Sequence, residues 1–380
     1  GARAHLTTRQ DIQIHDLPAA RVAQVVAACD PLGYPFRGGG GNTYRNLVVG
    51  PSSGLSASGC FDVYPYAHAV NRAVMASDAA FQLPRKFKIG FFAEAADALR
   101  AAVHDVGFVA TQRGGARGFV LTGGGGMGRE SRAGVLLSPF LPAGDAVRAA
   151  LAAVALFHAH GDRENRNQAR LRFVLKRLGD EAFRERFWQA FDATVCDETV
   201  PEVPETALPE GFAARAAAAQ PDVGQDMDMR FDVWKQMAVL PTRFGAAVRS
   251  VRLFVPYGNL SAVQMRTVAR IAEEAGSPFV RALPAQDLLI PFAADAELPA
   301  LFARLRRELA GLDVTVDSYK GHVVTCVGAT VCRIGVADAP AAGDALAAEL
   351  DRFLPADTPA KLRLFRRVAD DVRISGCPNA

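Results

Sequence analysis

Three cysteines near the end of the chain have neighbours and spacing that suit an iron–sulfur cluster. Cys326 and Cys332 lie in the stretch TCVGATVC, and Cys377 lies in the stretch ISGCPNA. A cluster needs thiolates from several backbone segments, and small residues allow the tight turns that hold them. The CxxC spacing typical of zinc ribbons is absent from the sequence. Because free cysteine also packs as a small hydrophobic residue, burial in a core is the alternative interpretation.

A four-iron cluster takes four thiolates, and these stretches supply three of them. A fourth cysteine in a GCPNxC pattern would lie just beyond Ala380. The first residues, GARAHLTTRQ, enter a strand pattern almost at once. We therefore expect the sequence to be a fragment of a longer protein, cut at both ends.

The composition is that of a globular protein long enough for two or more domains. Half of the 380 residues are hydrophobic, and the formal net charge is +3. No apolar run approaches the roughly 20 residues of a membrane span, so we expect no membrane partner. The small basic excess does not indicate a nucleic-acid partner. The six scattered cysteines lack disulfide-type density, which predicts a reducing, cytoplasmic location.

Hydrophobic periodicity predicts the elements that must position these residues. Alternation indicates strands, and recurrence every three to four residues indicates helices. Strands are expected at 6–16, 42–50, 83–91, 106–112, 118–123, 248–258 and 281–292. Helices are expected at 17–30, in a stretch ending near 81, and at 97–105, 145–160, 164–179, 261–276 and 297–309. Asp145 is the expected N-cap of its helix, and Ser261 with Gln264 forms a capping box.

An internal repeat connects the two halves of the chain. The stretches LTTRQDIQIHDLPAARVAQVV and RALPAQDLLIPFAADAELPALFARL share a Gln-Asp-apolar-x-Ile core, and a helical pattern follows each. After the first copy come NTYRNLVVG and LPRKFKIGF, and after the second come TCVGATVC and DVRISGCPN. The first set carries Arg and Lys, whereas the second carries Cys. A pseudo-twofold duplication would therefore line one cavity with cations on one side and sulfur on the other.

Four separated motifs together resemble a known family. LTTRQDIQIH, NTYRNLVVG, LPRKFKIGF and CVGATVC with GCPN resemble, in the same order, the landmarks of the sulfite and nitrite reductases that carry sirohaem. The resemblance covers nearly the whole chain. It implies an α+β fold, in which a ferredoxin-like half-domain and a mixed α/β domain that binds sirohaem and a 4Fe-4S cluster are each duplicated about a pseudo-twofold axis.

The resemblance also implies an order of domains. A first ferredoxin-like half-domain is expected at 1–36 and a sirohaem-binding domain at 37–199. A linker at 200–240 follows, because the composition shifts to Pro, Glu and Ala within it. The second half-domain is expected at 241–312. The 4Fe-4S domain, truncated, is expected at 313–380.

The resemblance implies that Arg9, Arg45, Lys86 and Lys88 bind the substrate oxyanion. Arginine supplies a planar, permanently charged fork, whereas lysine can give up a proton when other cations crowd it. Lys86 and Lys88 stand two apart on a strand and should point to the same side. Taken singly, each of these residues would more commonly be a surface cation.

Cofactor contacts follow from the same resemblance. Sirohaem is a polycarboxylate, and the residues expected to contact it are Arg85, Arg129, Arg163, Arg166, Arg170, Gln10 and Asn379. A solvated helix edge is the alternative for the Arg163, Arg166 and Arg170 stripe. The expected cluster ligands are Cys326, Cys332 and Cys377. The family's last cysteine, which bridges the cluster to the haem iron, is missing from this sequence.

The glycine run GGGGMG at 123–128 satisfies the GxGxxG dinucleotide pattern. However, no clear helix start follows it, and no acidic residue of a βαβ unit stands about 20 positions on. In the family that the chain resembles, a similar glycine-rich turn lies against the haem. Without a flavin or NADPH signature, we expect electrons to come from ferredoxin or from a separate flavoprotein reductase.

The leading function is assimilatory-type, six-electron reduction of sulfite to sulfide, because GNTYRN looks more like the sulfite branch. Nitrite reduction to ammonia on the same site is close behind. A precorrin-3B synthase-like enzyme of cobalamin synthesis is a third alternative, and the intact set of four cations argues against it. An inactive scaffold or electron-transfer subunit is the non-enzyme alternative, and the missing fourth thiolate supports it.

Overall fold

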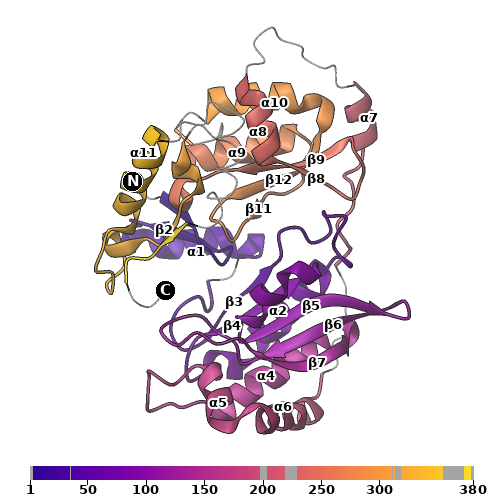
Figure 1. Ribbon diagram of the computed structural model, residues 1–380, viewed down its shortest axis with the longest axis vertical. Coiled ribbons are helices and arrows are strands. Elements are labelled where there is room, and N and C mark those ends of the chain that lie inside the picture. The colour runs from indigo at the N-terminus through magenta and orange to yellow at the C-terminus, as the bar shows by residue number, and fades with distance from the viewer. Residues whose placement is uncertain are drawn as a thin grey trace. The chain divides into compact units, whose positions relative to one another are not determined.

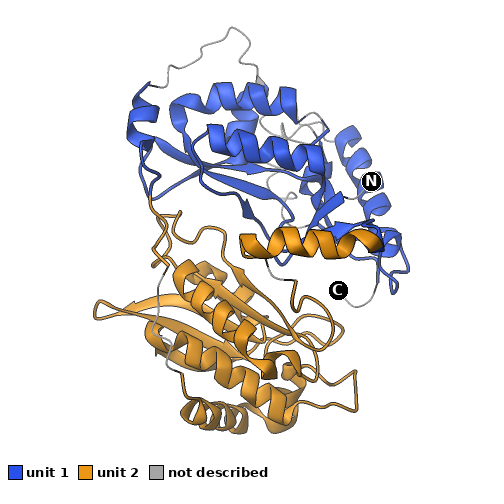
Figure 2. Ribbon diagram, turned by 180° about the vertical axis from the view of Figure 1, so that it is seen from behind, with its two compact units in different colours: residues 1–19, 208–380 blue, residues 20–207 orange. Residues whose placement is uncertain are grey.

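The structure is a computed structural model that describes residues 3–34, 36–196, 203–218, 229–309, 311–312, 318–353 and 372–377. The chain divides into two compact units. Unit 1 comprises residues 1–19 and 208–380, and unit 2 comprises residues 20–207 (Figure 2). Among the described residues, no helix is both long and apolar enough to cross a membrane.

Unit 2 is built on a mixed five-stranded sheet (Figure 1). Its strands, in spatial order, are β3 (Tyr44–Val49), β4 (Phe87–Phe92), β5 (Val106–Arg113), β6 (Ala116–Gly123) and β7 (Val135–Pro142). The first three run parallel, and β6 and β7 continue the sheet antiparallel. Parallel neighbours end at the same edge of a sheet, so the residues that flank β3 and β4 are brought close together.

Helices cover both faces of this sheet. They are α2 (Tyr64–Ala76), α3 (Ala98–Ala102), α4 (Ala146–His160), α5 (Leu171–Leu178) and α6 (Asp180–Ala193). The remaining helix assigned to unit 2, α1 (Val22–Cys29), has no buried residue and does not belong to this core. The larger core combines α2, α4, α5 and α6 with alternate residues of the strands, and α4 contributes several buried alanines that let its neighbours approach closely. Phe91 and Phe108 stack there with ring centroids 4.2 Å apart. On the opposite face, α3 packs Ala101 against Phe92 and Val109.

The described residues of unit 1 form three small sheets. The largest is antiparallel, with the strand order β11 (Arg281–Ala282), β12 (Leu288–Ala294), β9 (Val248–Leu253) and β8 (Val239–Pro241). A second sheet joins β10 (Asn259–Ser261), β1 (Arg3–Leu6) and β2 (Ile12–His15), and a parallel pair joins β13 (Val324–Thr325) and β14 (Arg373–Ile374). The helices are α7 (Phe212–Ala218), α8 (Met229–Ala238), α9 (Ala262–Glu274), α10 (Leu298–Glu308) and α11 (Ala339–Phe353). The core of this unit centres on Trp234 and Phe302. The expected α+β class is confirmed.

The internal repeat is visible in backbone geometry. Gln10 and Gln286, which align in the repeat, both adopt the left-handed conformation, with φ of 63° and 66°. The same is true of Asp16 and Phe292, with φ of 57° and 62°. This region is sparsely populated by residues other than glycine. Two aligned pairs of unusual conformations therefore indicate the same local structure in both copies.

The second part of each copy also matches its counterpart. β3 and β4 are a parallel pair connected through α2, and β13 and β14 are a parallel pair connected through α11. In the first copy this βαβ unit carries the cations, and in the second it carries Cys326 and Cys377. A common scaffold thus holds two different sets of side chains.

Several local predictions were wrong. The expected strand 6–16 is a hairpin, because a turn at Thr7–Asp11 separates β1 from β2. The segment 163–169 is not helical, since α5 begins only at Leu171. Asp145 is the N-cap residue of α4, as predicted, although its side chain makes no capping hydrogen bond.

The expected linker at 200–240 is partly folded. α7, α8 and β8 lie within it, and Phe212 and Trp234 are buried there. Burying such large aromatic side chains anchors both helices in unit 1. The capping box at the start of α9 is confirmed, because the Ser261 side chain accepts from the Gln264 backbone N–H and the Gln264 side chain accepts from that of Ser261. The other domain boundaries stay a prediction.

Candidate functional site

Two neighbouring strands of unit 2 carry cations at one edge of the sheet. Arg45 lies in β3, and Lys86 immediately precedes β4, which pairs with β3 in parallel. Along β4, Phe87 and Ile89 are in the core, whereas Lys86 and Lys88 are half-buried. This alternation agrees with the expectation that the two lysines point to the same side.

The cations of this edge repel one another. Burial, followed by the positive charges of Arg170, Arg45 and Arg85, lowers the pKa of Lys86, and Asp105 opposes the shift. Burial and the charges of Arg166 and Arg170 likewise lower the pKa of Arg85. A group of cations held this close together is a favourable binding site for an anion, because a bound negative charge would relieve their mutual repulsion.

Asp105 is the buried carboxylate that organises this group. Its Oδ2 lies 2.9 Å from Nη2 of Arg170, and both side chains are almost wholly buried, at 0% and 6% exposure. The same oxygen accepts the backbone N–H of Lys88 at 2.9 Å. Within the described residues, Oδ1 of Asp105 and Nε of Arg170 are buried without a hydrogen-bond partner. The pair fixes Arg170 but leaves one of its donors unused.

The glycine-rich turn at 123–128 lies against two of these guanidinium groups. A Cβ at Gly126 would lie 3.1 Å from Nη2 of Arg170 and 3.1 Å from Nη1 of Arg172. Arg172 also donates to the carbonyl of Met127 at 3.1 Å. Burial and the charge of Arg170 lower the pKa of Arg172. Glycine at this position lets the backbone approach both side-chain cations closely.

Sequence reasoning missed Arg172 and Asp105. Arg172 is two residues beyond Arg170, inside α5, and is buried although it is charged. Asp105 immediately precedes β5 and closes the expected helix 97–105. In both cases the available signal was a charged residue beside or within a hydrophobic run. Such a residue is expected to be buried, and buried charges are rare unless they are paired, so each predicts a partner of opposite charge.

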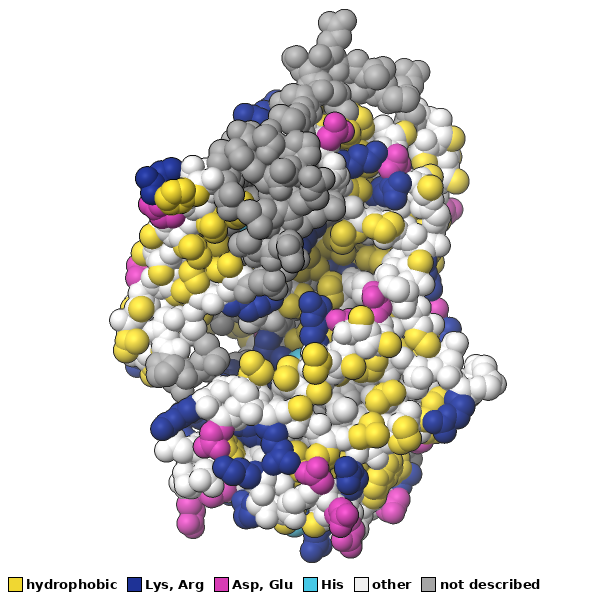
Figure 3. Space-filling view, in the orientation of Figure 1, with side chains coloured by type: hydrophobic (Ala, Val, Ile, Leu, Met, Phe, Trp, Pro, Cys, Tyr) yellow, Lys and Arg dark blue, Asp and Glu magenta, His cyan; other side chains and the backbone are white. Residues whose placement is uncertain are grey.

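The other predicted arginines of unit 2 have different surroundings. Arg163 is exposed and donates to the carbonyls of Gln82 and His158, at 3.0 and 3.1 Å. Arg129 and Arg166 are exposed. Because 163–169 is not helical, the predicted stripe does not lie along one helix face. Figure 3 shows Lys and Arg side chains gathered on one face of unit 2.

The cysteine segments meet in unit 1. The pairing of β13 with β14 continues into a hydrogen bond from the N–H of Cys326 to the carbonyl of Ile374, at 3.1 Å. The Sγ of Cys326 accepts the N–H of Gly328 at 3.3 Å and that of Gly376 at 3.2 Å. A Cβ at either glycine would lie 2.5 Å from the backbone of the segment 337–339. Small residues are therefore required to hold these loops together.

These surroundings fit a cluster ligand at Cys326. Two N–H donors aimed at one sulfur stabilise a thiolate, and hydrogen bonds of this kind tune iron–sulfur clusters. The turn that contains Cys332 is closed by its N–H, which donates to the carbonyl of Gly328 at 2.9 Å. In the part of the chain that the structure describes, no three His, Cys, Asp or Glu side chains are grouped closely enough to hold a metal ion. The ligand set of Cys326, Cys332 and Cys377 stays a prediction, and Asn379 lies outside the described residues.

Arg9 and Gln10 occupy the turn between β1 and β2, in unit 1. The Thr7 hydroxyl accepts the N–H of Arg9 at 3.2 Å and that of Asp11 at 3.1 Å, which fixes the turn from within. Gln10 donates its side-chain amide to the carbonyl of Ala282 at 2.9 Å. Arg9 thus belongs to the same unit as the cysteines, whereas Arg45, Lys86 and Lys88 belong to unit 2.

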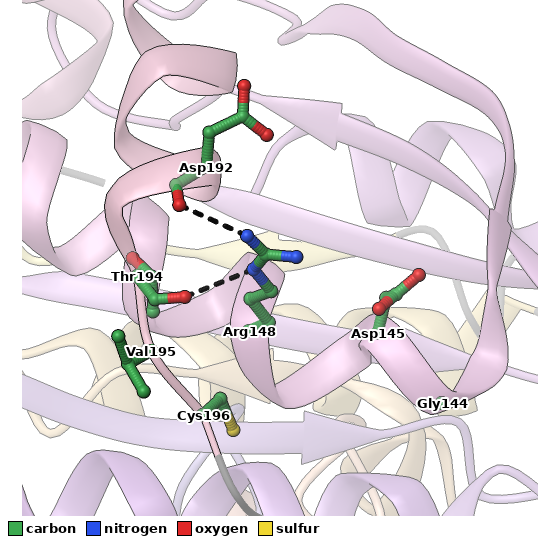
Figure 4. Close-up of a pocket in the computed structure, with 7 residues that line it drawn as sticks. All are labelled: Gly144, Asp145, Arg148, Asp192, Thr194, Val195 and Cys196. Carbon is green, nitrogen blue, oxygen red and sulfur yellow. Dashed lines mark hydrogen bonds between the residues drawn. The ribbon is translucent and has the colours of Figure 1, made fainter.

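A cavity of about 340 Å³ in unit 2 lies apart from these cations (Figure 4). Its lining residues are Gly144, Asp145, Arg148, Asp192, Thr194, Val195 and Cys196. Arg148 donates to the carbonyls of Phe191, Asp192 and Thr194 at 2.9 to 3.2 Å. Its guanidinium therefore caps the C-terminal end of α6, which is a structural role.

Two family descriptions match the chain. The nitrite and sulphite reductase 4Fe-4S domain matches residues 40–193, and the nitrite/sulfite reductase ferredoxin-like half domain matches residues 245–308. The chain belongs to the nitrite and sulfite reductase family. Arg45, Lys86 and Lys88 lie within the first matched range, and the three cysteines lie outside both.

Relatives within the nitrite and sulfite reductase family carry both substrate names. The ferredoxin–nitrite reductase of Synechococcus elongatus is 25% identical over 100% of this chain and 68% of its own length. Sulfite reductase [ferredoxin] 1 of Mycolicibacterium paratuberculosis is 24% identical over 99% of this chain and 62% of its own. The structure of the Mycobacterium tuberculosis NirA protein has the same fold, with a TM-score of 0.76 at 22% identity, over 100% of this chain and 63% of that one. The chain thus spans about two thirds of these longer proteins.

Proposed function

We propose that the protein to which this chain belongs reduces a small oxyanion, sulfite or nitrite, by six electrons. The observation that supports this most directly is the group of mutually repelling cations around Lys86, with Arg45, Arg85 and Arg170. Structural cations are usually matched by carboxylates, but among the charges of the described residues that act on Lys86 only Asp105 is negative. Such a group binds an anion and favours the negative charge that accumulates as electrons arrive.

Each cation has a role that follows from its chemistry. Arg45 and Arg9 supply planar forks that suit oxyanion oxygens. Lys86 and Lys88 bind the anion and donate protons to the oxygens that leave as water. The lowered pKa of Lys86 suits this second role, because a proton donor works best when its pKa approaches the working pH.

The cofactors proposed are sirohaem and a 4Fe-4S cluster, which would supply an open iron position and an electron store. We propose that Arg85 and Arg170, together with Arg172, which lies beside the same glycine as Arg170, neutralise carboxylates of the sirohaem. The unused buried Nε groups of Arg170 and Arg172 are consistent with a ligand of this kind. Cys326, Cys332 and Cys377 would bind the cluster through thiolates. We propose ferredoxin as the donor, because the relatives' names specify it.

Sulfite remains our leading substrate on the basis of the GNTYRN motif. Nitrite is the second candidate, and the Synechococcus relative carries that name. The discriminating experiment is a side-by-side assay of the full-length holoenzyme with reduced methyl viologen. We expect sulfide from sulfite at a higher kcat/KM than ammonia from nitrite. The reverse ratio would transfer the assignment to nitrite. Absence of both products would support a precorrin-3B synthase-like enzyme or an inactive electron-transfer subunit.

A further inference from the structure

The two copies of the repeat hold each other through a reciprocal pair of hydrogen bonds. Gln10 donates its side-chain amide to the carbonyl of Ala282 at 2.9 Å. Gln286, its counterpart, donates to the carbonyl of Leu6 at 3.1 Å. Leu6 is the last residue of β1, and Ala282 is the last residue of β11. Each glutamine therefore binds the equivalent carbonyl of the opposite hairpin, as a local twofold axis requires.

Both hairpins have the same turn geometry. Thr7 N–H donates to Asp11 at 2.9 Å, and Leu283 N–H donates to Asp287 at 2.8 Å. The left-handed conformations of Gln10 and Gln286 fall within these turns. Such conformations persist in residues other than glycine only where surrounding contacts enforce them. The reciprocal amide contacts are the contacts that would do so.

The Gln286 side chain is fixed by its surroundings. It is 2% exposed, and its Nε2 also lies 3.4 Å from Nε2 of His5. His5 presents Nδ1 to Oδ1 of Asn259 at 3.0 Å, so its proton belongs on Nδ1, and its Nε2 is an acceptor for Gln286. The amide nitrogen of Gln286 thus faces two acceptors, which excludes the flipped orientation.

The turns at 7–11 and 283–287 differ in the side chain that precedes the glutamine. The residue before Gln10 is Arg9, and the residue before Gln286 is Ala285. We propose that the reciprocal hydrogen bonds of Gln10 and Gln286, here called the clasp, hold the turn at 7–11 and thereby position Arg9. Gln286 acts from the buried side of this turn. The proposal rests on the proposed function only in assigning Arg9 to the anion. The clasp itself is a property of unit 1.

Hydrogen exchange in the full-length holoenzyme tests the clasp without any assay of activity. In Gln286→Leu, we expect the amides of both 7–11 and 283–287 to exchange about tenfold faster or more, because each turn loses a cross-contact. Gln13→Leu is the matched control, since Gln13 is an exposed residue of β2. Gln286→Glu keeps the shape but removes the amide donor, so it should behave like the Leu variant. Faster exchange confined to 283–287, or normal exchange in Gln286→Glu, would overturn the proposal.

A double-mutant cycle tests whether the clasp acts through Arg9. We expect Gln286→Leu to raise the KM for sulfite several-fold with little change in kcat, and to have no further effect on KM in an Arg9→Ala background. Equal effects in both backgrounds would overturn the positioning role. If Gln286→Leu fails to fold, hydrogen exchange in Gln10→Leu tests the reciprocal contact from the more exposed side. If the wild-type protein reduces neither anion, the proposed function fails, and hydrogen exchange alone decides the clasp.

Discussion

At the scale of single residues, the feature that distinguishes this chain is a cation group held together against its own repulsion. Lys86 is half-buried among three arginines, and its pKa is lowered first by burial and then by their charges. A lowered lysine pKa means that folding disfavours the bound proton. The free protein therefore gains stability as the pH rises through the folded pKa towards the ordinary value of 10.5.

Anion binding should depend on pH in the opposite sense. We expect the affinity for sulfite to be fully present while Lys86 is charged and to fall as the pH rises through its folded pKa, which lies below 10.5. Sulfite titrations of the oxidised holoenzyme, followed by absorbance from neutral pH up to the ordinary lysine value of 10.5, should show this loss. Lys86→Met should weaken binding and abolish the pH step. Lys176→Met is the control, because Lys176 is exposed and paired with Glu130. An unchanged pH step in Lys86→Met would contradict the assignment.

Asp105 holds two members of the same cation group, because its Oδ2 binds Arg170 and the backbone N–H of Lys88. Asp105→Asn removes the charge that pairs with buried Arg170, so we expect a loss of about 3–5 kcal/mol in the free energy of unfolding. Urea unfolding measures this loss. In the control, Asp180→Asn breaks the exposed pair with Arg132 and should cost less than about 1 kcal/mol. Similar small losses in both variants would show that the buried pair does not hold Arg170.

At the scale of elements, the sequence predicted regular patterns well and irregular ones poorly. The capping box of α9 and the strands around Phe87 and Phe108 follow from local rules. The hairpin turn at Thr7–Asp11 could not be predicted from local rules, because its left-handed residue is Gln10 and the turn contains no Gly or Asn. β7 was not predicted, since it contains Pro139 and ends at Pro142, which an edge strand tolerates.

The glycine-rich turn is the element whose role changed most once the structure was known. Its sequence satisfies a nucleotide pattern, but its backbone instead approaches two arginines. Gly126→Ala would place a methyl group against both guanidinium groups, and we expect a reduced sirohaem content with little change in the melting temperature. Gly144→Ala is the control, because a Cβ there meets nothing within 4 Å. Full cofactor content in Gly126→Ala, measured by absorbance, would contradict this role.

At the scale of the whole molecule, duplication explains why one chain carries two kinds of chemistry. The same hairpin and βαβ unit occur twice, with cations on one copy and cysteines on the other. The repeat could be predicted because the Gln-Asp core survives in both copies. The pairing of Arg170 with Asp105 could not be predicted, because the two residues are distant in sequence and meet only in the folded interior. Each unit therefore carries its own set of functional side chains on a related scaffold.

The cofactor content of the full-length protein, purified without oxygen, tests this account most directly. Iron and acid-labile sulfide analysis should give about five irons and about four sulfides per chain, the sum of one 4Fe-4S cluster and one sirohaem. The absorption spectrum should contain a Soret band and the lower-energy bands of the same haem. A protein that is folded but contains neither iron nor these bands would contradict the account.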